Sequence, residues 1–130
     1  MSTSIDQKCR YRESHEWARP VAGDEYECGI TNHAEQALGD VVFVELPSVG
    51  TSFTQGAAFG VIESVKAASD LYMPMGGTIT AVNSNLVDNP ALVNQDCYQQ
   101  GWIIRFKVAH NQDWDGLLTP DAYADIVARQ

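Results

Sequence analysis

The chain has 130 residues, enough for one domain, and 45% of them are hydrophobic, as in ordinary globular proteins. With 17 acidic against 8 basic residues, its formal net charge is −9, which argues against a nucleic-acid partner because phosphates would be repelled. No apolar run approaches the roughly 18 residues of a membrane-spanning helix, so we also expect no membrane partner. The negative charge serves either solubility or attraction to basic faces of partner proteins.

The N-terminal residues and the cysteines indicate a reducing compartment. Residues 1–9 lack the apolar stretch of a secretory signal, so we predict a flexible N-terminal segment there and a cytoplasmic location. Cys9, Cys28 and Cys97 show no paired spacing, and their odd number suits reduced thiols. The sequence has no zinc-binding, nucleotide-binding or Gly-x-Ser-x-Gly motif, so we predict neither a metal site nor catalytic machinery. Its length predicts one domain over residues 1–130.

The first elements in chain order are a strand and a short helix. Residues 25–30 alternate between polar and apolar side chains and predict a strand. Thr31 or Asn32 can then cap a helix over residues 33–38. Gly39 is expected to end this helix, since glycine adopts the left-handed conformation without a Cβ penalty.

Three further strands follow. Residues 41–46 are β-branched or aromatic and are halted by Pro47, which makes them the strongest strand prediction. The apolar residues 57–62 form the next strand. Residues 71–73 alternate and form a third, which is stopped by a proline at position 74.

Lys66 lies between the last two of these strands, at the tip of the hairpin that they predict. A lysine at such a tip stands clear of the body, where a modifying enzyme can reach its amine. Most surface lysines, however, are solvated charges with no other role. The hairpin alone therefore leaves both interpretations of Lys66 open.

The next part of the chain contains two more strands separated by a polar segment. Residues 78–83 have period two and follow a Gly-Gly turn. Residues 85–96 hold Asn, Asp and Pro and predict a loop with at most one helical turn, around 90–93. Residues 102–108 alternate again, and one face of that strand is apolar and suits the core: Trp102, Ile104, Phe106 and Val108.

The C-terminal residues change to a helical period. Residues 113–118 predict one turn, and Thr119 is expected to cap a helix with Pro120 at its first position and Asp121 near the positive end of its dipole. One side of this helix can dock on the sheets through Tyr123, Ile126 and Val127. Short strands about ten residues apart, followed by this helix, predict a mostly β sandwich capped by a helix.

With these segments in place, the chain resembles the H proteins of the glycine cleavage system. The resemblance rests on several blocks in the right order: Ser14-His15-Glu16-Trp17, residues 29–34 and 38–47, Glu63-Ser64-Val65-Lys66-Ala67-Ala68-Ser69-Asp70, residues 92–94, Tyr98 and Gly101-Trp102. The chain departs from the family's usual residues away from the lysine, at Pro20, Cys28, Met73 and Met75.

The resemblance implies a fold, a cofactor and three further site residues. The fold would be a barrel-sandwich hybrid, or hammerhead, of antiparallel sheets with short helices and a C-terminal helix. Lys66 would carry lipoic acid in amide linkage. Ser14, Glu16 and Asp70 would dock the aminomethyl-loaded arm, the two carboxylates as charge partners and Ser14 as a hydrogen-bond partner. Without the resemblance, Ser14 is equally well a turn residue, Glu16 a solvated charge and Asp70 a residue at the end of the hairpin.

The resemblance also implies partners and a non-catalytic carrier function. The pyridoxal-phosphate-dependent glycine decarboxylase (P protein) would load the arm as carbon dioxide leaves. The folate-dependent aminomethyltransferase (T protein) would take the carbon and release ammonia, and dihydrolipoyl dehydrogenase (L protein) would restore the disulfide. A lipoate ligase or a lipoyl/octanoyl transferase would attach the cofactor.

Four alternatives compete with this function. Biotinyl domains place methionine on both sides of their lysine, whereas Val65 and Ala67 flank Lys66 here. Lipoyl domains of 2-oxoacid dehydrogenases typically have aspartate before the lysine and lack the His-Glu-Trp block. A lipoylated H protein can also donate its cofactor to other carriers, which needs the same lysine. An unmodified sandwich that only binds proteins is the fourth possibility.

Overall fold

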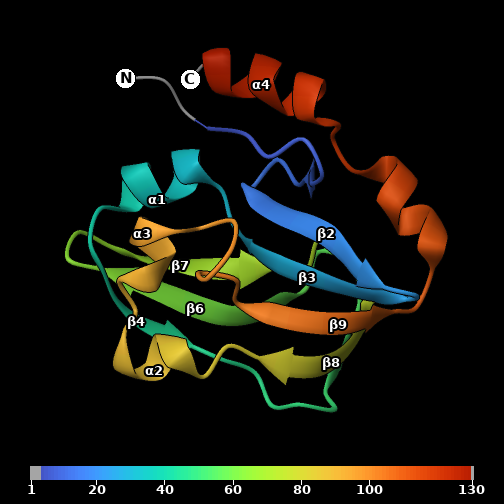
Figure 1. Cartoon of the computed structure of the whole chain (residues 1–130), viewed down its shortest axis with the longest axis horizontal. Helices are drawn as coiled ribbons and strands as arrows, with labels where there is room; N and C mark the ends of the chain where they lie inside the picture. Colours follow the sequence, from blue (N-terminus) through green and yellow to red (C-terminus); the bar gives the residue numbers. More distant parts are fainter. Residues whose placement is uncertain (1–3, 130) are drawn as a thin grey trace.

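Two antiparallel sheets enclose the core in the computed structural model, which describes residues 4–129 (Figure 1). The six-stranded sheet has the order β1 (Arg10–Tyr11), β2 (Glu16–Ala22), β3 (Glu25–Ile30), β9 (Ile104–Val108), β8 (Gly77–Val82) and β5 (Ser52–Phe53). The three-stranded sheet has the order β4 (Val41–Glu45), β6 (Ala58–Ser64) and β7 (Ala68–Tyr72). The helices are α1 (Asn32–Leu38), α2 (Asn85–Asp88), α3 (Leu92–Gln95) and α4 (Pro120–Ala128), with a 3₁₀ turn over Asn111–Gly116. The predicted mostly β class is confirmed.

The predicted strands and caps agree with the structure to within a few residues. Thr31, rather than Asn32, caps α1, because its hydroxyl accepts a hydrogen bond from the amide of Ala34. Gly39 ends α1 with φ +80°, as expected. Thr119 caps α4 with Pro120 in its first turn. The C-terminal helix and its start are therefore readable from local sequence.

Some segments differ from the sequence prediction. No strand is predicted for the residues of β1, β2 or β5. Strand β1 pairs only with Trp17 and Ala18 of β2, which leaves β2 at the sheet edge where Pro20 lies. Proline is tolerated at such an edge because no neighbour needs its missing N–H. Residues 85–96 hold two short helices instead of a loop with one turn, and one buried side chain anchors each, Leu86 in α2 and Val93 in α3.

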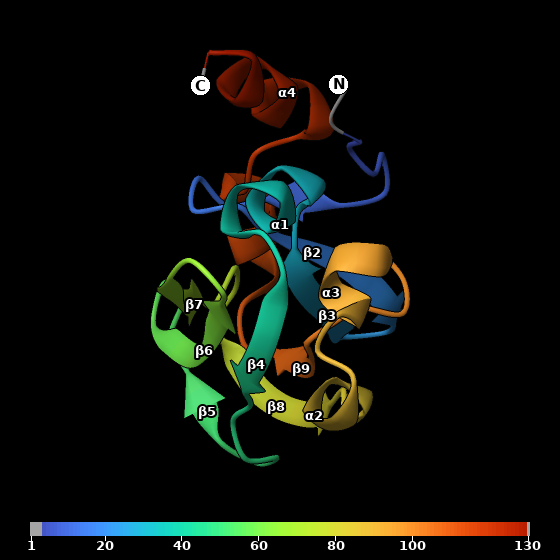
Figure 2. The same ribbon diagram turned by 90° about the vertical axis from the view of Figure 1, so that its left-hand side faces the viewer.

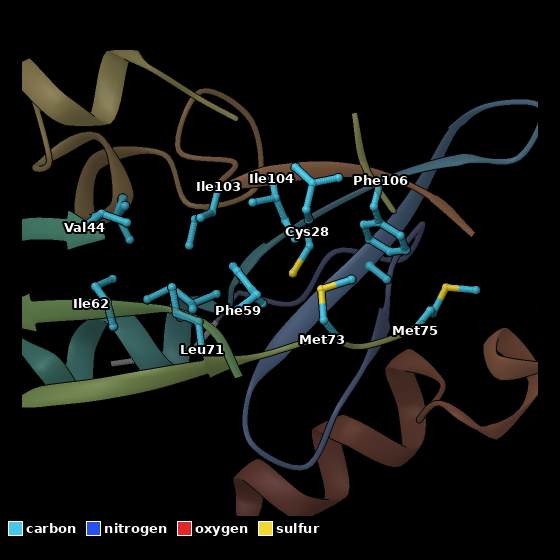
Figure 3. Packing of buried hydrophobic residues seen from close by; sticks show 14 of the residues in the cluster. Cys28, Val44, Phe59, Ile62, Leu71, Met73, Met75, Ile103, Ile104 and Phe106 are labelled. Carbon is cyan, nitrogen blue, oxygen red and sulfur yellow. The ribbon is translucent and has the colours of Figure 1, made fainter. Parts of the chain in front are cut away.

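The core lies between the sheets. Figure 3 shows side chains of β6 and β7, such as Ile62 and Leu71, across from Ile104 of β9. Three departures from the family's usual residues also point into this layer and are almost fully buried: Cys28, Met73 and Met75. Methionine adapts to irregular spaces in a core, so these residues alter the local packing without exposing apolar surface.

A second, aromatic cluster joins α4 to the N-terminal strands. The rings of Tyr11 and Tyr123 stack with centroids 4.4 Å apart. The indole N–H of Trp17 reaches the carbonyl oxygens of Ile30 at 3.0 Å and Cys97 at 3.1 Å. The helix thus docks through Tyr123, as its period predicts, on the part of the sheet that begins with β1 and β2.

Residues 4–9 make specific contacts with neighbouring parts of the chain. The backbone amide of Ser4 donates a hydrogen bond to the side-chain oxygen of Asn32 at 2.9 Å. The carboxylate of Asp6 forms an ion pair with Arg19 at 3.2 Å. Cys9 is buried. Residues 1–3 of the predicted flexible segment lie outside the described residues, and the motion of the whole segment 1–9 stays a prediction.

The cysteines are expected to be unreactive while the protein is folded. Burial raises the pKa of Cys9 and Cys97 to about 12 and that of Cys28 well above its ordinary value. Because a thiol reacts as its thiolate, these three groups should modify slowly at pH 8 in buffer and rapidly in urea. Timed alkylation followed by intact mass measures both rates, and equal rates in the two solvents would contradict the expectation.

Gly60 is required where β6 passes β4. A Cβ built on Gly60 would lie 2.4 Å from the carbonyl oxygen of Glu45, which is backbone and cannot turn away. Gly60→Ala should therefore lower the free energy of unfolding by about 2–3 kcal/mol, a typical cost of overpacking. Urea denaturation measures this change. Gly116→Ala is the matched control, since a Cβ there meets nothing within 4 Å, and an equal loss in both variants would refute the steric explanation.

Candidate functional site

Lys66 occupies the exposed tip of the β6–β7 hairpin, as predicted. The hydroxyl of Ser64 accepts hydrogen bonds from the backbone amides of Lys66 and Ala67, each at 3.2 Å, and the amide of Ser64 donates to the Ala67 carbonyl at 2.8 Å. The amide of Val65 donates to the carbonyl of Asp40 at 3.1 Å and ties the tip to the segment before β4. The turn therefore holds the backbone of Lys66 in place and leaves its amine accessible.

The lysine side chain runs past the end of α1. A Cβ built on Gly39 would lie 3.3 Å from Cε and 3.7 Å from Nζ of Lys66. Glycine at this position thus both permits the positive φ that ends α1 and leaves room for the lysine. Figure 2 shows α1, β4 and β6 on the side of the molecule that faces the viewer.

A groove of about 230 Å³ lies between α1 and the β6–β7 hairpin. Its walls are mainly apolar, from Ile30, Ala34, Ala37, Leu38, Ile62 and Leu71. Its polar lining comes from Ser14, His15, Glu16, Ser69 and Asp70. Leu38 is followed by Gly39, against which the Lys66 side chain lies, so one wall of the groove begins beside the lysine.

Glu16 is the buried carboxylate of this groove, with 2% of its surface exposed. One of its oxygens accepts a hydrogen bond from the Ser14 hydroxyl, and the other accepts from the Tyr72 amide at 3.0 Å. Burial raises the pKa of Glu16, while the bonds from Ser14 and Tyr72 and the charge of Arg12 act in the opposite direction. Glu16 is therefore not a solvated surface charge, which was its alternative interpretation.

Ser14 and Asp70 approach the groove from different elements. Ser14 is exposed in the turn before β2, where the amide of His15 donates to the carbonyl of Arg12 at 2.9 Å. Asp70 is exposed on β7, opposite Val61 of β6. The structure thus brings together all four residues predicted from the sequence at or beside one groove, although positions 16 and 70 are far apart in the chain.

His15 also lines the groove and is not predicted from the sequence. Its φ is +78°, and its Nδ1 lies 2.8 Å from the hydroxyl of Tyr123, which in turn lies 2.7 Å from Oγ1 of Thr31. The His33 ring is 4.8 Å away, and burial together with His33 lowers the pKa of His15. Only its place between Ser14 and Glu16 in the chain could have indicated that it lies here.

Among residues 4–129, no group of three or more His, Cys, Asp or Glu side chains is arranged to hold a metal ion. No helix in that range is long and apolar enough to cross a membrane.

Comparisons with known proteins agree on one family. The profile of the family described as "Glycine cleavage H-protein" matches residues 9–130. A protein of Haloarcula marismortui named "Probable glycine cleavage system H protein" is 54% identical over 96% of this chain and 98% of its own. A "Glycine cleavage system H protein" of Chromohalobacter salexigens is 49% identical over 97% and 96%. The crystal structure of a glycine cleavage system H protein from Mycobacterium marinum superposes with a TM-score of 0.84 at 38% identity, covering 93% of this chain and 97% of that one.

Proposed function

Because the chain belongs to the family of glycine cleavage H proteins, the non-catalytic lipoyl carriers of the glycine cleavage system, we propose that Lys66 carries lipoic acid in amide linkage. The domain over residues 1–130 is then a single lipoyl-carrier domain. This domain takes the aminomethyl group of glycine from the decarboxylase to the folate-dependent aminomethyltransferase. Dihydrolipoyl dehydrogenase then reoxidises the dihydrolipoyl arm. When attached, the lipoyl group supplies a disulfide that accepts this one-carbon group and the electrons released with carbon dioxide. A lipoate ligase or a lipoyl/octanoyl transferase makes the attachment.

The observation that carries the proposal is an exposed lysine on an anchored turn beside an apolar groove. The hydroxyl of Ser64 accepts hydrogen bonds from the amides of Lys66 and Ala67, which anchors the backbone at the base of the arm. Bond lengths give the lipoylated side chain a reach of roughly 10–15 Å from its Cα. This reach is long enough to deliver a sulfur atom into the cleft of another protein or back into the groove.

The residues of the groove fit the arm in chemical character. The apolar walls of α1, β6 and β7 suit a hydrocarbon chain, and the carboxylates of Glu16 and Asp70 suit a cationic end group. An S–CH₂–NH₂ group decomposes when the nitrogen lone pair expels the thiolate. A nearby carboxylate favours the protonated nitrogen, which has no such lone pair. We assign this stabilisation to Glu16 and Asp70, with Ser14 as the group that orients Glu16 through its hydroxyl.

The function is tested by reconstitution from purified components. The chain is first treated with lipoate, ATP and a lipoate ligase, and intact mass with peptide mapping should show one lipoyl group at Lys66. The lipoylated form should then support decarboxylase-dependent exchange between bicarbonate and the glycine carboxyl group, whereas the unmodified form should not. Exchange by the unmodified form, or none by the lipoylated form, would overturn the proposal.

A further inference from the structure

Three consecutive residues line the arm groove, Ser14, His15 and Glu16. Successive side chains of an extended strand point to opposite faces, so regular β structure does not bring three in a row to one side. The positive φ of His15, +78°, breaks this alternation just before β2. Such a φ is uncommon for a residue other than glycine and persists only where surrounding contacts hold it. The contacts of His15 therefore decide the shape of this wall of the groove.

The backbone of His15 is held on both sides of the residue. Its amide donates to the carbonyl of Arg12 at 2.9 Å, and its carbonyl accepts from the amide of Thr31 at 3.0 Å. Thr31 is the N-cap of α1, and α1 forms another wall of the groove. The turn that carries Ser14 and Glu16 is therefore joined directly to the start of α1.

A single hydroxyl of the C-terminal helix joins the side chains of the same two residues. The hydroxyl oxygen of Tyr123 lies 2.8 Å from Nδ1 of His15 and 2.7 Å from Oγ1 of Thr31. A phenol can donate one hydrogen bond and accept another, so it bridges both partners in either tautomer of His15. Tyr123 and Thr31 are completely buried, and α4 lies at the same end of the molecule as α1 (Figure 2). The bridge is thus shielded from water.

The ring and the hydroxyl of Tyr123 have separable roles. The ring stacks on Tyr11 and packs in the aromatic cluster that docks α4. The hydroxyl instead reaches His15 and Thr31. Removal of the hydroxyl alone would leave two buried polar atoms without this partner, which costs free energy at the junction of the turn and α1. The docking of α4 would keep its apolar contacts.

From this geometry we propose that Tyr123 is a positioning residue of the groove, whose hydroxyl ties the turn carrying Glu16 to the N-cap of α1 and so holds Glu16 beside the cationic end of the arm. The inference rests on the proposed function, because it concerns the lifetime of the aminomethyl-loaded carrier. Attraction between two charges weakens as their separation grows and as water enters between them. A looser turn should therefore protect the loaded arm less, although the carboxylate is still present.

The first test compares Tyr123→Phe with Tyr11→Phe in the lipoylated carrier, loaded with glycine and the decarboxylase. Tyr11→Phe is the matched control, because it also loses a buried hydroxyl, which donates to the Asp6 carbonyl at 2.6 Å, and neither residue lines the groove. Tyr123→Phe should speed the release of formaldehyde about threefold at neutral pH and shift the pH profile of decay about half a unit lower. Tyr11→Phe should change neither, and both variants should be lipoylated normally.

A second test needs no cofactor. In the unmodified protein, the Thr31 amide, which bonds to the His15 carbonyl, should exchange its hydrogen about fivefold faster in Tyr123→Phe, the factor that corresponds to one net hydrogen bond. This increase should exceed any change in global stability, which urea denaturation measures. Tyr11→Phe should show no such excess.

A third test combines Tyr123→Phe with Glu16→Gln. If Tyr123 acts by placing the Glu16 carboxylate, the double variant should decay no faster than Glu16→Gln alone, whereas independent effects would multiply.

Four outcomes overturn the positioning role without touching the proposed function, provided that the lipoylated wild type supports bicarbonate exchange. They are an unchanged decay of Tyr123→Phe, an equal acceleration in Tyr11→Phe, an unchanged Thr31 amide, and multiplied effects in the double variant. Bicarbonate exchange that fails with the lipoylated wild type overturns the proposed function itself.

Discussion

Lys66→Arg is expected to abolish lipoylation and to leave the fold unchanged. The hairpin turn is held by backbone amides and the Ser64 hydroxyl, none of which belongs to the lysine side chain. Arginine keeps the positive charge but has no primary amine that can be acylated. Intact mass after incubation with lipoate, ATP and a lipoate ligase measures the modification, and thermal unfolding measures the stability. Exchange with the glycine decarboxylase should fall to the level of the unmodified wild type.

The chain offers two matched controls for this variant. Lys8 and Lys107 are the other lysines of the sequence, and both are exposed. Lys8→Arg and Lys107→Arg should each take one lipoyl group at the wild-type rate, since neither lies on the hairpin. A lipoyl increment on the Lys66→Arg protein would show that another residue is the attachment site.

Glu16→Gln is expected to shorten the lifetime of the aminomethyl-loaded carrier. The side-chain oxygen of glutamine can accept a hydrogen bond from the Tyr72 amide, and its NH₂ group can donate one to the Ser14 hydroxyl. Both contacts therefore remain while the negative charge is lost. The pKa of the bound ammonium then falls, and its decomposition should begin at lower pH. At neutral pH the decay should be roughly tenfold faster, which corresponds to about one pKa unit. Release of formaldehyde and ammonia, followed over time at several pH values, measures the decay.

The stability of this variant has a predictable sign. Burial raises the pKa of Glu16, so its ionised carboxylate is less stable in the folded protein than in the unfolded chain. Its replacement by an uncharged isostere should therefore not lower the free energy of unfolding, and lipoylation should be normal. Glu13→Gln is the control, since this exposed carboxylate does not line the groove. Identical decay of wild type, Glu16→Gln and Glu13→Gln would remove Glu16 from the protective role.

Much of the fold follows from patterns that are local in the sequence. The alternation of residues 25–30 and the β-branched run 41–46 correspond to β3 and β4, and Thr119 with Pro120 begins α4. These predictions succeed because the period of a strand and the capping of a helix depend on neighbours a few positions away. Strand β2 is not predicted, and it holds Pro20 at a position where β1 no longer pairs with it, which is a tertiary feature rather than a local pattern.

The residues of the candidate site also fall into two groups, those predictable from the local sequence and those that only the tertiary structure brings together. That Lys66 stands at a hairpin tip, and that Ser14 lies two positions from Glu16, is already decided in the sequence, because a turn and a two-residue spacing need no distant partner. The tertiary structure decides the rest. Glu16 is buried and bonds to the amide of Tyr72 in β7, His15 has a positive φ beside Tyr123 of α4, and Asp70 borders the same groove. Such contacts join positions tens of residues apart, and only the close packing of the two sheets and α4 determines which of them meet.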